Sequence, residues 1–98
     1  MVQVKPIVTK DMEHCIVCGR YGAEWHHVFE GHSNRPKSDR YGLIVPLCPL
    51  HHRDTKEGVH GQNSALYKGI KKYTQIKAMK HYGWSAEEFI NIFGKSYL

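Results

Sequence analysis

Two pairs of residues in this chain have the types and the spacing that bind a metal ion. Two residues separate Cys15 from Cys18, and two residues separate Cys48 from His51 further along the chain. In each pair a tight turn lets both side chains reach one ion. Two such pairs supply the four sulfur and nitrogen ligands of a tetrahedral structural zinc site. The sequence therefore predicts structural Zn²⁺ on these four residues.

Other interpretations of the cysteines fit less well. A single C-x-x-C can arise by chance among ordinary buried cysteines, but a second pair at the same spacing makes chance a poor explanation. A redox C-x-x-C site is expected beside a thioredoxin-like βαβ pattern, which this sequence does not show. Zinc also explains how so small a core can be stable, because metal binding contributes folding free energy.

Two adjacent histidine pairs accompany the zinc ligands. With His51 assigned to zinc, His52 stays free, and its direction on a short helix differs from that of His51 by about 100°. His26 and His27 belong to the segment WHHVF, which predicts a strand. Adjacent strand residues point to opposite sides, so these two histidines should have different roles. A lone surface HH pair would mean little, but two pairs in these positions predict a second site beside the zinc.

The elements that must position these side chains lie between residues 12 and 61. The expected order is a knuckle, a strand, a polar loop over 31–40, a second strand over 41–47, a second knuckle and a short helix. Pro49 suits the first turn of that helix, and the helix is expected to end near Glu57.

Residues 62–98 predict a basic helical extension. Residues 62–82 contain five lysines and no acidic residue. Helical spacing predicts an apolar face at Leu66, Ile70, Tyr73, Ile76 and Met79. A capping box, Ser85-x-x-Glu88, predicts a second helix from Ala86. The lysines fit a solvated surface or contacts to DNA phosphates, and the lack of acids favours DNA.

Length and charge limit the class of protein. The 98 residues suffice for one domain, 1–98, in which 12–61 form the zinc-bound core and 62–98 the basic extension. The net charge of +5 favours a polyanionic partner, most simply nucleic acid. No apolar run predicts a membrane span or a signal peptide, so a cytoplasmic protein without a membrane partner is expected.

The motifs together resemble a known family. The segments CIVCG, WHHVFEG, SDRYGLIVPLCPLHH, GVHG and FINIFGKSYL cover most of residues 15–98. They resemble the HNH, or ββα-metal, nucleases, and more narrowly the phage recombination-enhancement, RecA-dependent nucleases. The resemblance implies a small α+β, zinc-stabilised ββα-metal (HNH, treble-clef-like) domain with a C-terminal helical extension. It implies metal-dependent endonucleolytic cleavage of DNA in phage recombination or repair, with a RecA filament on DNA as partner, in the cytoplasm of a bacterial host.

The resemblance also implies roles for the histidines outside the zinc site. It makes His26 and His52 ligands of a catalytic ion and His27 the general base. A neutral imidazole can accept a proton from water near pH 7. Two protein ligands would leave coordination positions open for phosphate and water, which fits Mg²⁺ or Mn²⁺. His60 is either a further ligand, if the chain reverses at Gly58, or a surface histidine.

The chain departs from the HNH pattern at one position. The stretch YGLIVPL lacks the Asn that orients the base in the family, and Asn34, Ser38 and Asp39 remain alternatives for that role. The candidate DNA contacts are Arg35, Lys37, Arg40, Lys68, Lys71 and Lys72. The alternative function is a non-catalytic zinc-finger DNA-binding module. It would share the zinc and the basic helix but would have no need for His27 beside a metal.

Overall fold

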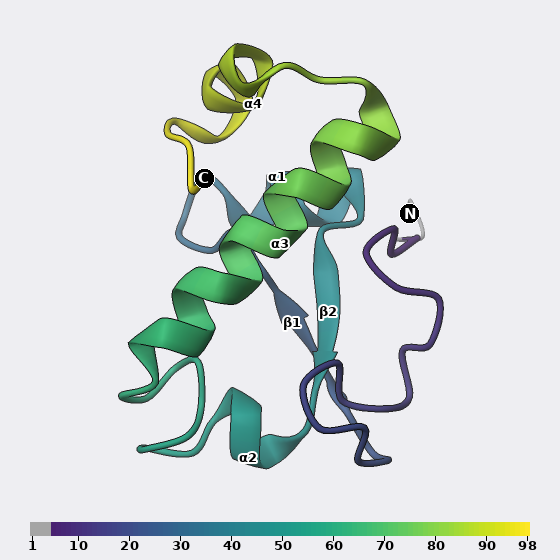
Figure 1. The fold of residues 1–98 in the computed structure, drawn as a ribbon, viewed down its shortest axis with the longest axis vertical. Helices are drawn as coiled ribbons and strands as arrows, with labels where there is room; N and C mark the ends of the chain where they lie inside the picture. The colour runs from purple at the N-terminus through teal and green to yellow at the C-terminus, as the bar shows by residue number, and fades with distance from the viewer. Residues whose placement is uncertain (1–4) are drawn as a thin grey trace.

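Two short antiparallel strands form the centre of this small α+β fold, shown as a computed structural model that describes residues 5–98 (Figure 1). Strand β1 (Glu24–His27) pairs with β2 (Ile44–Leu47), and the register places His26 opposite Val45. All of β2 is buried, whereas His26 is the buried residue of β1. The strand β1 therefore directs one histidine into the molecule and keeps its neighbour accessible.

The connection between the strands contains a helix that the sequence did not predict. The expected polar loop over 31–40 is wrong in its second half, where α1 (Arg35–Tyr41) forms and delays the start of β2 to Ile44. Pro36 suits the first turn of a helix. Gly42 ends the helix with φ at 71°, a left-handed conformation that glycine adopts without a steric penalty.

The predicted short helix after β2 exists but is a single turn. Helix α2 (Pro49–His52) ends well before the predicted Glu57. The carboxylate of Asp54 accepts the backbone N–H groups two and three residues later, at 3.0 and 2.9 Å, and so forms a turn that competes with the helix. The chain then reverses, and the N–H of His60 donates to the carbonyl of His52 at 3.2 Å.

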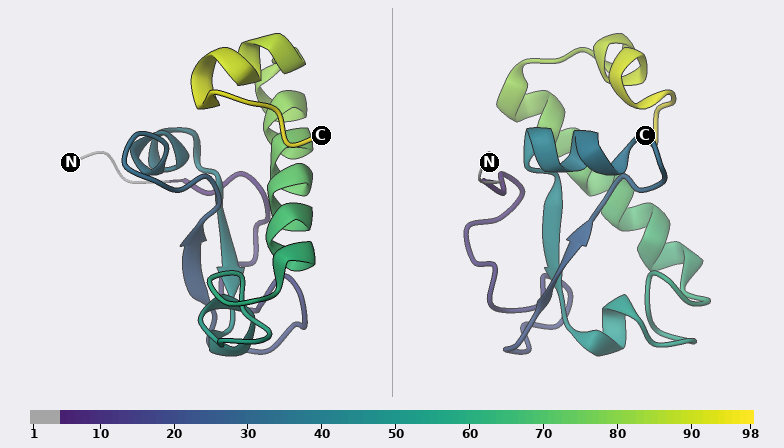
Figure 2. Two further views of the ribbon diagram at one scale, coloured as in Figure 1. Left: turned by 90° about the vertical axis from the view of Figure 1, so that its left-hand side faces the viewer. Right: turned by 180° about the vertical axis from the view of Figure 1, so that it is seen from behind.

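Two further helices complete the fold, as the sequence predicts. The long helix α3 (Ser64–Tyr82) lies across one face of the sheet, and α4 (Ala86–Phe93) follows it (Figures 1 and 2). Ser85 and Glu88 form the predicted capping box. The views place α2 at one end of the sheet and α1 with α4 at the other. None of the helices within residues 5–98 is both long and apolar enough to cross a membrane.

The buried face of α3 differs from the predicted one. Tyr73 and Ile76 belong to the predicted apolar face, but they are 45% and 47% exposed. The buried residues are Ile70, Lys71, Thr74, Gln75 and Ala78. The Gln75 amide donates to Ser96 Oγ at 3.0 Å and accepts from the Tyr97 N–H at 2.6 Å. The C-terminal segment thus packs against the Gln75 side chain. The face of α3 that is buried therefore includes polar residues and differs from the apolar face predicted from the sequence.

The aromatic core lies where the end of β1 meets α4. Phe29 is fully buried, with ring centroids 5.2 Å from Phe89, 4.8 Å from Phe93 and 5.2 Å from Tyr97. This cluster fixes the end of β1 that carries the histidine pair. The first four residues of the expected 1–98 domain lie outside the described part of the chain.

Candidate metal centres

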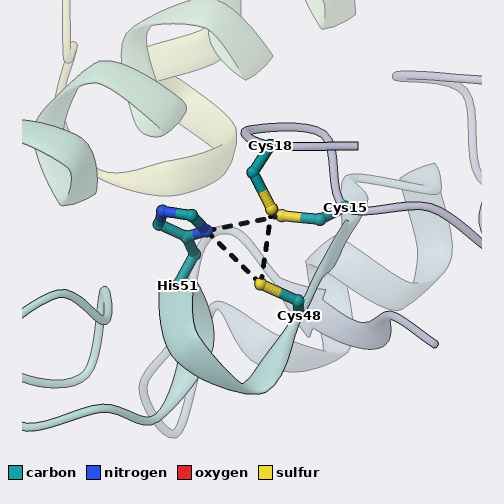
Figure 3. A group of neighbouring side chains, drawn as sticks. All are labelled: Cys15, Cys18, Cys48 and His51. Carbon is teal, nitrogen blue, oxygen red and sulfur yellow. Dashed lines mark hydrogen bonds between the residues drawn. The ribbon is translucent and has the colours of Figure 1, made fainter. Parts of the chain in front are cut away.

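The four predicted zinc ligands meet at one point. Figure 3 shows Cys15 and Cys18, from the loop before β1, directed toward Cys48 and His51 at the start of α2. The four ligand atoms all lie within 4.8 Å of one another. Cys18 Sγ is 3.7 Å from Cys48 Sγ, and His51 Nδ1 is 3.3 Å from Cys48 Sγ and 3.8 Å from Cys15 Sγ.

These distances match the edges of a tetrahedron around zinc. Bonds of about 2.3 Å to sulfur and about 2.0 Å to nitrogen would separate two sulfurs by about 3.8 Å and a sulfur from a nitrogen by about 3.5 Å. The residues therefore fit the predicted structural zinc, which would join the N-terminal loop to α2.

The turn from Cys15 to Cys18 also favours the thiolate form of Cys15. The N–H of Val17 donates to Cys15 Sγ at 3.4 Å. Burial opposes ionisation of this thiol, but hydrogen bonds from the backbone of Cys48, Cys18 and Val17 prevail and lower the pKa of Cys15 to about 6. The thiolate is the form that binds metal. The backbone of the turn therefore favours the deprotonated form of Cys15, in which it can bind a metal ion.

A second cluster joins three histidines from three separate segments. His26 from β1, His52 from α2 and His60 from the loop after α2 place ligand nitrogens within 4.8 Å of one another. The Nε2 atoms of His52 and His60 are 3.1 Å apart. The ring of His26 lies 5.2 Å from that of His52 and 5.1 Å from that of His60. The structure thus brings His60 to the cluster. This agrees with the alternative in which the chain reverses near Gly58 and His60 is a candidate ligand.

Two glutamates lie next to this cluster, and one of them is hydrogen-bonded to a ring. Glu24 accepts a hydrogen bond from His52 Nδ1 at 2.9 Å and pairs with Arg53 at 2.6 Å. The bond from His52, and then the charge of Arg53, lower the pKa of Glu24. Because His52 Nδ1 donates, its Nε2 lone pair points into the cluster. Glu30 lies 3.7 Å from His60 Nδ1, too far for a hydrogen bond but close enough for a charge interaction.

Neither glutamate was among the residues predicted for the site. The position of only one of them, Glu24, could have been predicted from the sequence. Glu24 lies two residues before His26 on the same strand, so strand alternation places it on the same side as a predicted ligand. Glu30 follows the end of β1 in an irregular segment, where no periodicity predicts its direction.

The chain reversal that delivers His60 depends on two glycines. A Cβ on Gly58 would approach the backbone N and O of Asp54 at 2.7 Å, and one on Gly61 would overlap the backbone oxygens of Asp54 and Thr55. The N–H of Val59 also donates to the His51 carbonyl at 2.8 Å. The loop is therefore tied to α2, which carries ligands of both clusters.

The buried position of His26 favours the neutral imidazole. The residue is only 4% exposed. Burial, followed by the nearby His52 and His60, lowers its pKa to about 3. A metal ion requires a deprotonated imidazole nitrogen, and His26 supplies one at every physiological pH.

His27 lies beside this cluster and has a carboxylate partner. Its Nε2 is 2.6 Å from Asp39 Oδ1, an oxygen of α1. An ionised carboxylate only accepts hydrogen bonds, so it selects the tautomer of neutral His27 in which Nε2 carries the proton and Nδ1 has the lone pair. Of the three residues left open by the sequence, Asn34 instead donates to the Phe93 carbonyl at 3.2 Å and Ser38 to the Phe29 carbonyl at 2.6 Å.

One hollow of about 850 Å³ joins these groups. The three cluster histidines, His27 and Asp39 all line it. Trp25 and Arg35 also line it. A histidine with a carboxylate partner, a candidate metal cluster and a cation therefore share one accessible space, and such groups can together act on an anionic ester.

The loop cations have different surroundings. Arg35 and Arg40 are exposed, and only Arg35 lines the hollow. Lys37 is half-buried, and its Nζ donates to the Ile92 carbonyl at 2.5 Å, so it ties α1 to α4. Its predicted role as a DNA contact is not supported by this placement, since the ammonium already has a structural partner.

The lysines of α3 also divide into two groups. Lys68 and Lys72 are exposed, as a DNA contact requires, but Lys71 is only 6% exposed. Its Nζ lies 4.5 Å from the ring centroid of Tyr67 and 4.9 Å from that of Tyr97, in cation–π geometry, and burial lowers its pKa. The prediction of Lys71 as a surface DNA contact is therefore wrong.

Comparisons with family models, with curated proteins and with solved structures give no match for this chain. The likeness to HNH nucleases consequently rests on the motifs and the geometry described above.

Proposed function

We propose that this protein is a metal-dependent DNA endonuclease of the HNH, or ββα-metal, type. The observation that carries the proposal is the position of His27, which is held by Asp39 on the wall of the hollow that also contains His26, His52 and His60. A protein that only binds DNA has no evident use for an oriented base beside a candidate metal cluster.

The order of elements supports the same class. The candidate base and one ligand lie on β1, a second ligand lies on α2, and the zinc ligands join α2 to the loop before β1. Two strands followed by a short helix, with ligands on the first strand and the helix, are what the ββα-metal resemblance implies.

Each residue has a defined task in this proposal. His27 accepts a proton from the attacking water at Nδ1, and Asp39 stabilises the imidazolium that forms. His26, His52 and His60 would hold a divalent ion, and Glu24 orients His52 by its hydrogen bond. When bound, that ion would neutralise charge on the scissile phosphate and stabilise the leaving oxygen. Arg35 provides a second positive charge for the phosphate in the same hollow.

The donor set affects which ion is proposed. Two ligands, His26 and His52, were predicted from the sequence, and the open coordination positions around them favoured Mg²⁺ or Mn²⁺. The structure instead brings three imidazoles together, because His60 joins the cluster. Mg²⁺ and Mn²⁺ prefer oxygen ligands, whereas imidazole suits Zn²⁺, Ni²⁺ and related ions. Three histidines with open positions also occur in catalytic zinc sites. We therefore propose Zn²⁺, Ni²⁺ or a related imidazole-preferring ion here, with Mn²⁺ and Mg²⁺ as weaker substitutes.

The choice of DNA as substrate is based on charge. The chain carries a net charge of +5, and the exposed cations Arg35, Arg40, Lys68 and Lys72 are free to meet phosphates. A role in phage recombination, with RecA-coated DNA as the target, is based on the narrower resemblance alone.

Nicking of supercoiled plasmid tests the proposal. Zinc-loaded protein is incubated with plasmid and with Zn²⁺, Ni²⁺, Mn²⁺ or Mg²⁺ in turn, with and without RecA filaments. We expect nicking that requires an added ion and is abolished in a His26→Ala, His52→Ala double variant that keeps the structural zinc. DNA binding without nicking under any ion would favour the zinc-finger binding module. Equal nicking without RecA would remove only the narrower family assignment.

A further inference from the structure

Trp25 is a large aromatic side chain that the fold leaves accessible. It is 50% exposed, whereas Trp84, the other tryptophan, stacks on Tyr82 with ring centroids 4.6 Å apart. Within residues 5–98 no aromatic ring pairs with Trp25. Much of the indole surface is therefore free to meet a ligand.

The location of this indole is informative. Trp25 and His27 are two residues apart on β1, so strand alternation places both side chains on the same side of the strand. Both line the hollow of about 850 Å³, together with the guanidinium-bearing Arg35 and the histidine cluster. That volume lies within the range of small-molecule ligand pockets, about 300–1,000 Å³.

The hollow thus offers an apolar π surface at one position and cationic or metal-binding groups at others. A nucleotide has the complementary pair of features, a flat aromatic base joined to a phosphate. A simple inorganic anion or an aliphatic ligand would use only one half of this arrangement.

We propose that Trp25 is a stacking platform for one base of the nucleic acid, with the adjoining phosphate directed to Arg35 and the histidine cluster. This inference rests on the proposed function, because it uses the same hollow. Within a duplex, both faces of a base are covered by neighbouring base pairs. The indole can therefore stack only on a base that is unpaired or turned out of the helix. The hollow accordingly selects strands that contain an unstacked nucleotide.

Fluorescence titration tests the platform without any need for cleavage. In a Trp84→Phe variant, Trp25 is the remaining tryptophan, so its emission reports contact with a base directly. The probes are a short oligothymidylate and a blunt-ended duplex of equal length, at one fixed salt concentration and without added divalent ion. We expect quenching by the single strand and little quenching by the duplex. Equal quenching by both probes, or none by the single strand, would overturn the proposal.

Affinity measurements on substituted proteins provide the second readout. Stacking of a base on an aromatic side chain contributes enough that Trp25→Ala should weaken oligothymidylate binding by about 5- to 100-fold. Trp25→Phe should recover most of this loss because it keeps an aromatic face. Tyr21→Ala is the matched control, since Tyr21 is 71% exposed but does not line the hollow. Trp25→Ala with wild-type single-strand affinity would contradict the platform, provided that zinc content and circular dichroism match the wild type.

Failure of this inference and failure of the proposed function give different results. If wild-type protein nicks plasmid and Trp25→Ala binds single strands normally, the nuclease proposal stands and the platform is wrong. If no ion supports nicking but Trp25→Ala loses single-strand affinity selectively, the platform stands and the protein binds DNA without cleaving it.

Discussion

At the residue scale, the contact between His27 and Asp39 is the basis for proposing acid–base chemistry at this site. The two atoms are 2.6 Å apart, and the carboxylate fixes which imidazole nitrogen holds the proton. The partner comes from α1, twelve residues later in the chain. Spacing identified the zinc ligands because each pair is local, but no local rule could choose among Asn34, Ser38 and Asp39. Only the fold makes that choice.

Substitution of the orienting carboxylate should therefore separate structure from catalysis. Asp39→Asn keeps the size of the side chain but no longer fixes the His27 tautomer or stabilises the imidazolium. We expect plasmid nicking to slow by about 10²- to 10⁴-fold, the range for loss of acid–base function, with DNA affinity unchanged. Asn34→Ala is the control, since that amide bonds to the Phe93 carbonyl instead of His27. A folded Asp39→Asn protein that nicks at the wild-type rate would exclude this role for Asp39.

Lys71 and Lys72 are adjacent in the sequence but differ completely in their surroundings. Lys71 is buried among aromatic rings, and Lys72 faces solvent. Replacement of Lys72 by Met should weaken binding to duplex DNA of any sequence and reduce the slope of log affinity against log salt by about 0.9, the effect of one phosphate contact. Lys71→Met should leave both quantities unchanged. Equal effects of the two substitutions would show that the DNA does not distinguish the two positions.

At the element scale, the helix after β1 and the orientation of α3 were the features that periodicity did not reveal. Residues 31–40 lack a regular apolar pattern, so their polar composition predicted a loop. The helix α1 is instead fixed by its ends and by Ser38, whose hydroxyl exchanges hydrogen bonds with the backbone of Phe29. Similarly, Gln75 binds the C-terminal segment and buries a polar position that hydrophobic periodicity cannot predict. By contrast, the capping box at Ser85 is a local signal and was predicted correctly.

The loop between α2 and α3 offers a direct test of how elements build the histidine cluster. A Cβ at Gly61 would overlap the backbone of Asp54 and Thr55, so Gly61→Ala should open the loop and displace His60. We expect the affinity of the three-histidine cluster for a metal ion, measured by calorimetry, to fall by about 10- to 100-fold, as for other losses of metal-site support. The structural zinc should remain bound.

The matching control for that substitution lies on α3. A Cβ at Gly69 would meet no atom within 4 Å, so Gly69→Ala should leave metal binding unchanged. It should also stabilise the protein by about 0.5–1 kcal/mol, because alanine is the better helix former. Normal ion affinity in Gly61→Ala would mean that the loop conformation does not control His60.

At the scale of the whole molecule, the cluster of Cys15, Cys18, Cys48 and His51 joins two segments that are far apart in the sequence. It connects the loop before β1 to α2, which lies at the opposite end of the sheet from α4 (Figure 1). The aromatic core contains Phe89 and Phe93 of α4. Cys48→Ser should therefore release the zinc and abolish the cooperative thermal transition. His52→Ala should keep both the structural zinc and that transition, because His52 belongs to the other cluster. Cys48→Ser protein with wild-type thermal stability would refute the structural role of zinc.

The most direct test of the proposed mechanism compares His27→Ala with the wild type in one plasmid-nicking assay, at saturating Zn²⁺, Ni²⁺ or Mn²⁺. Zinc content, circular dichroism and DNA affinity serve as controls for both proteins. Because His27 is the proposed base and does not belong to either metal cluster, the variant should match the wild type in all three controls. Its nicking rate should fall by about 10²- to 10⁴-fold. A folded, zinc-loaded His27→Ala protein that nicks plasmid at the wild-type rate would contradict the proposed mechanism.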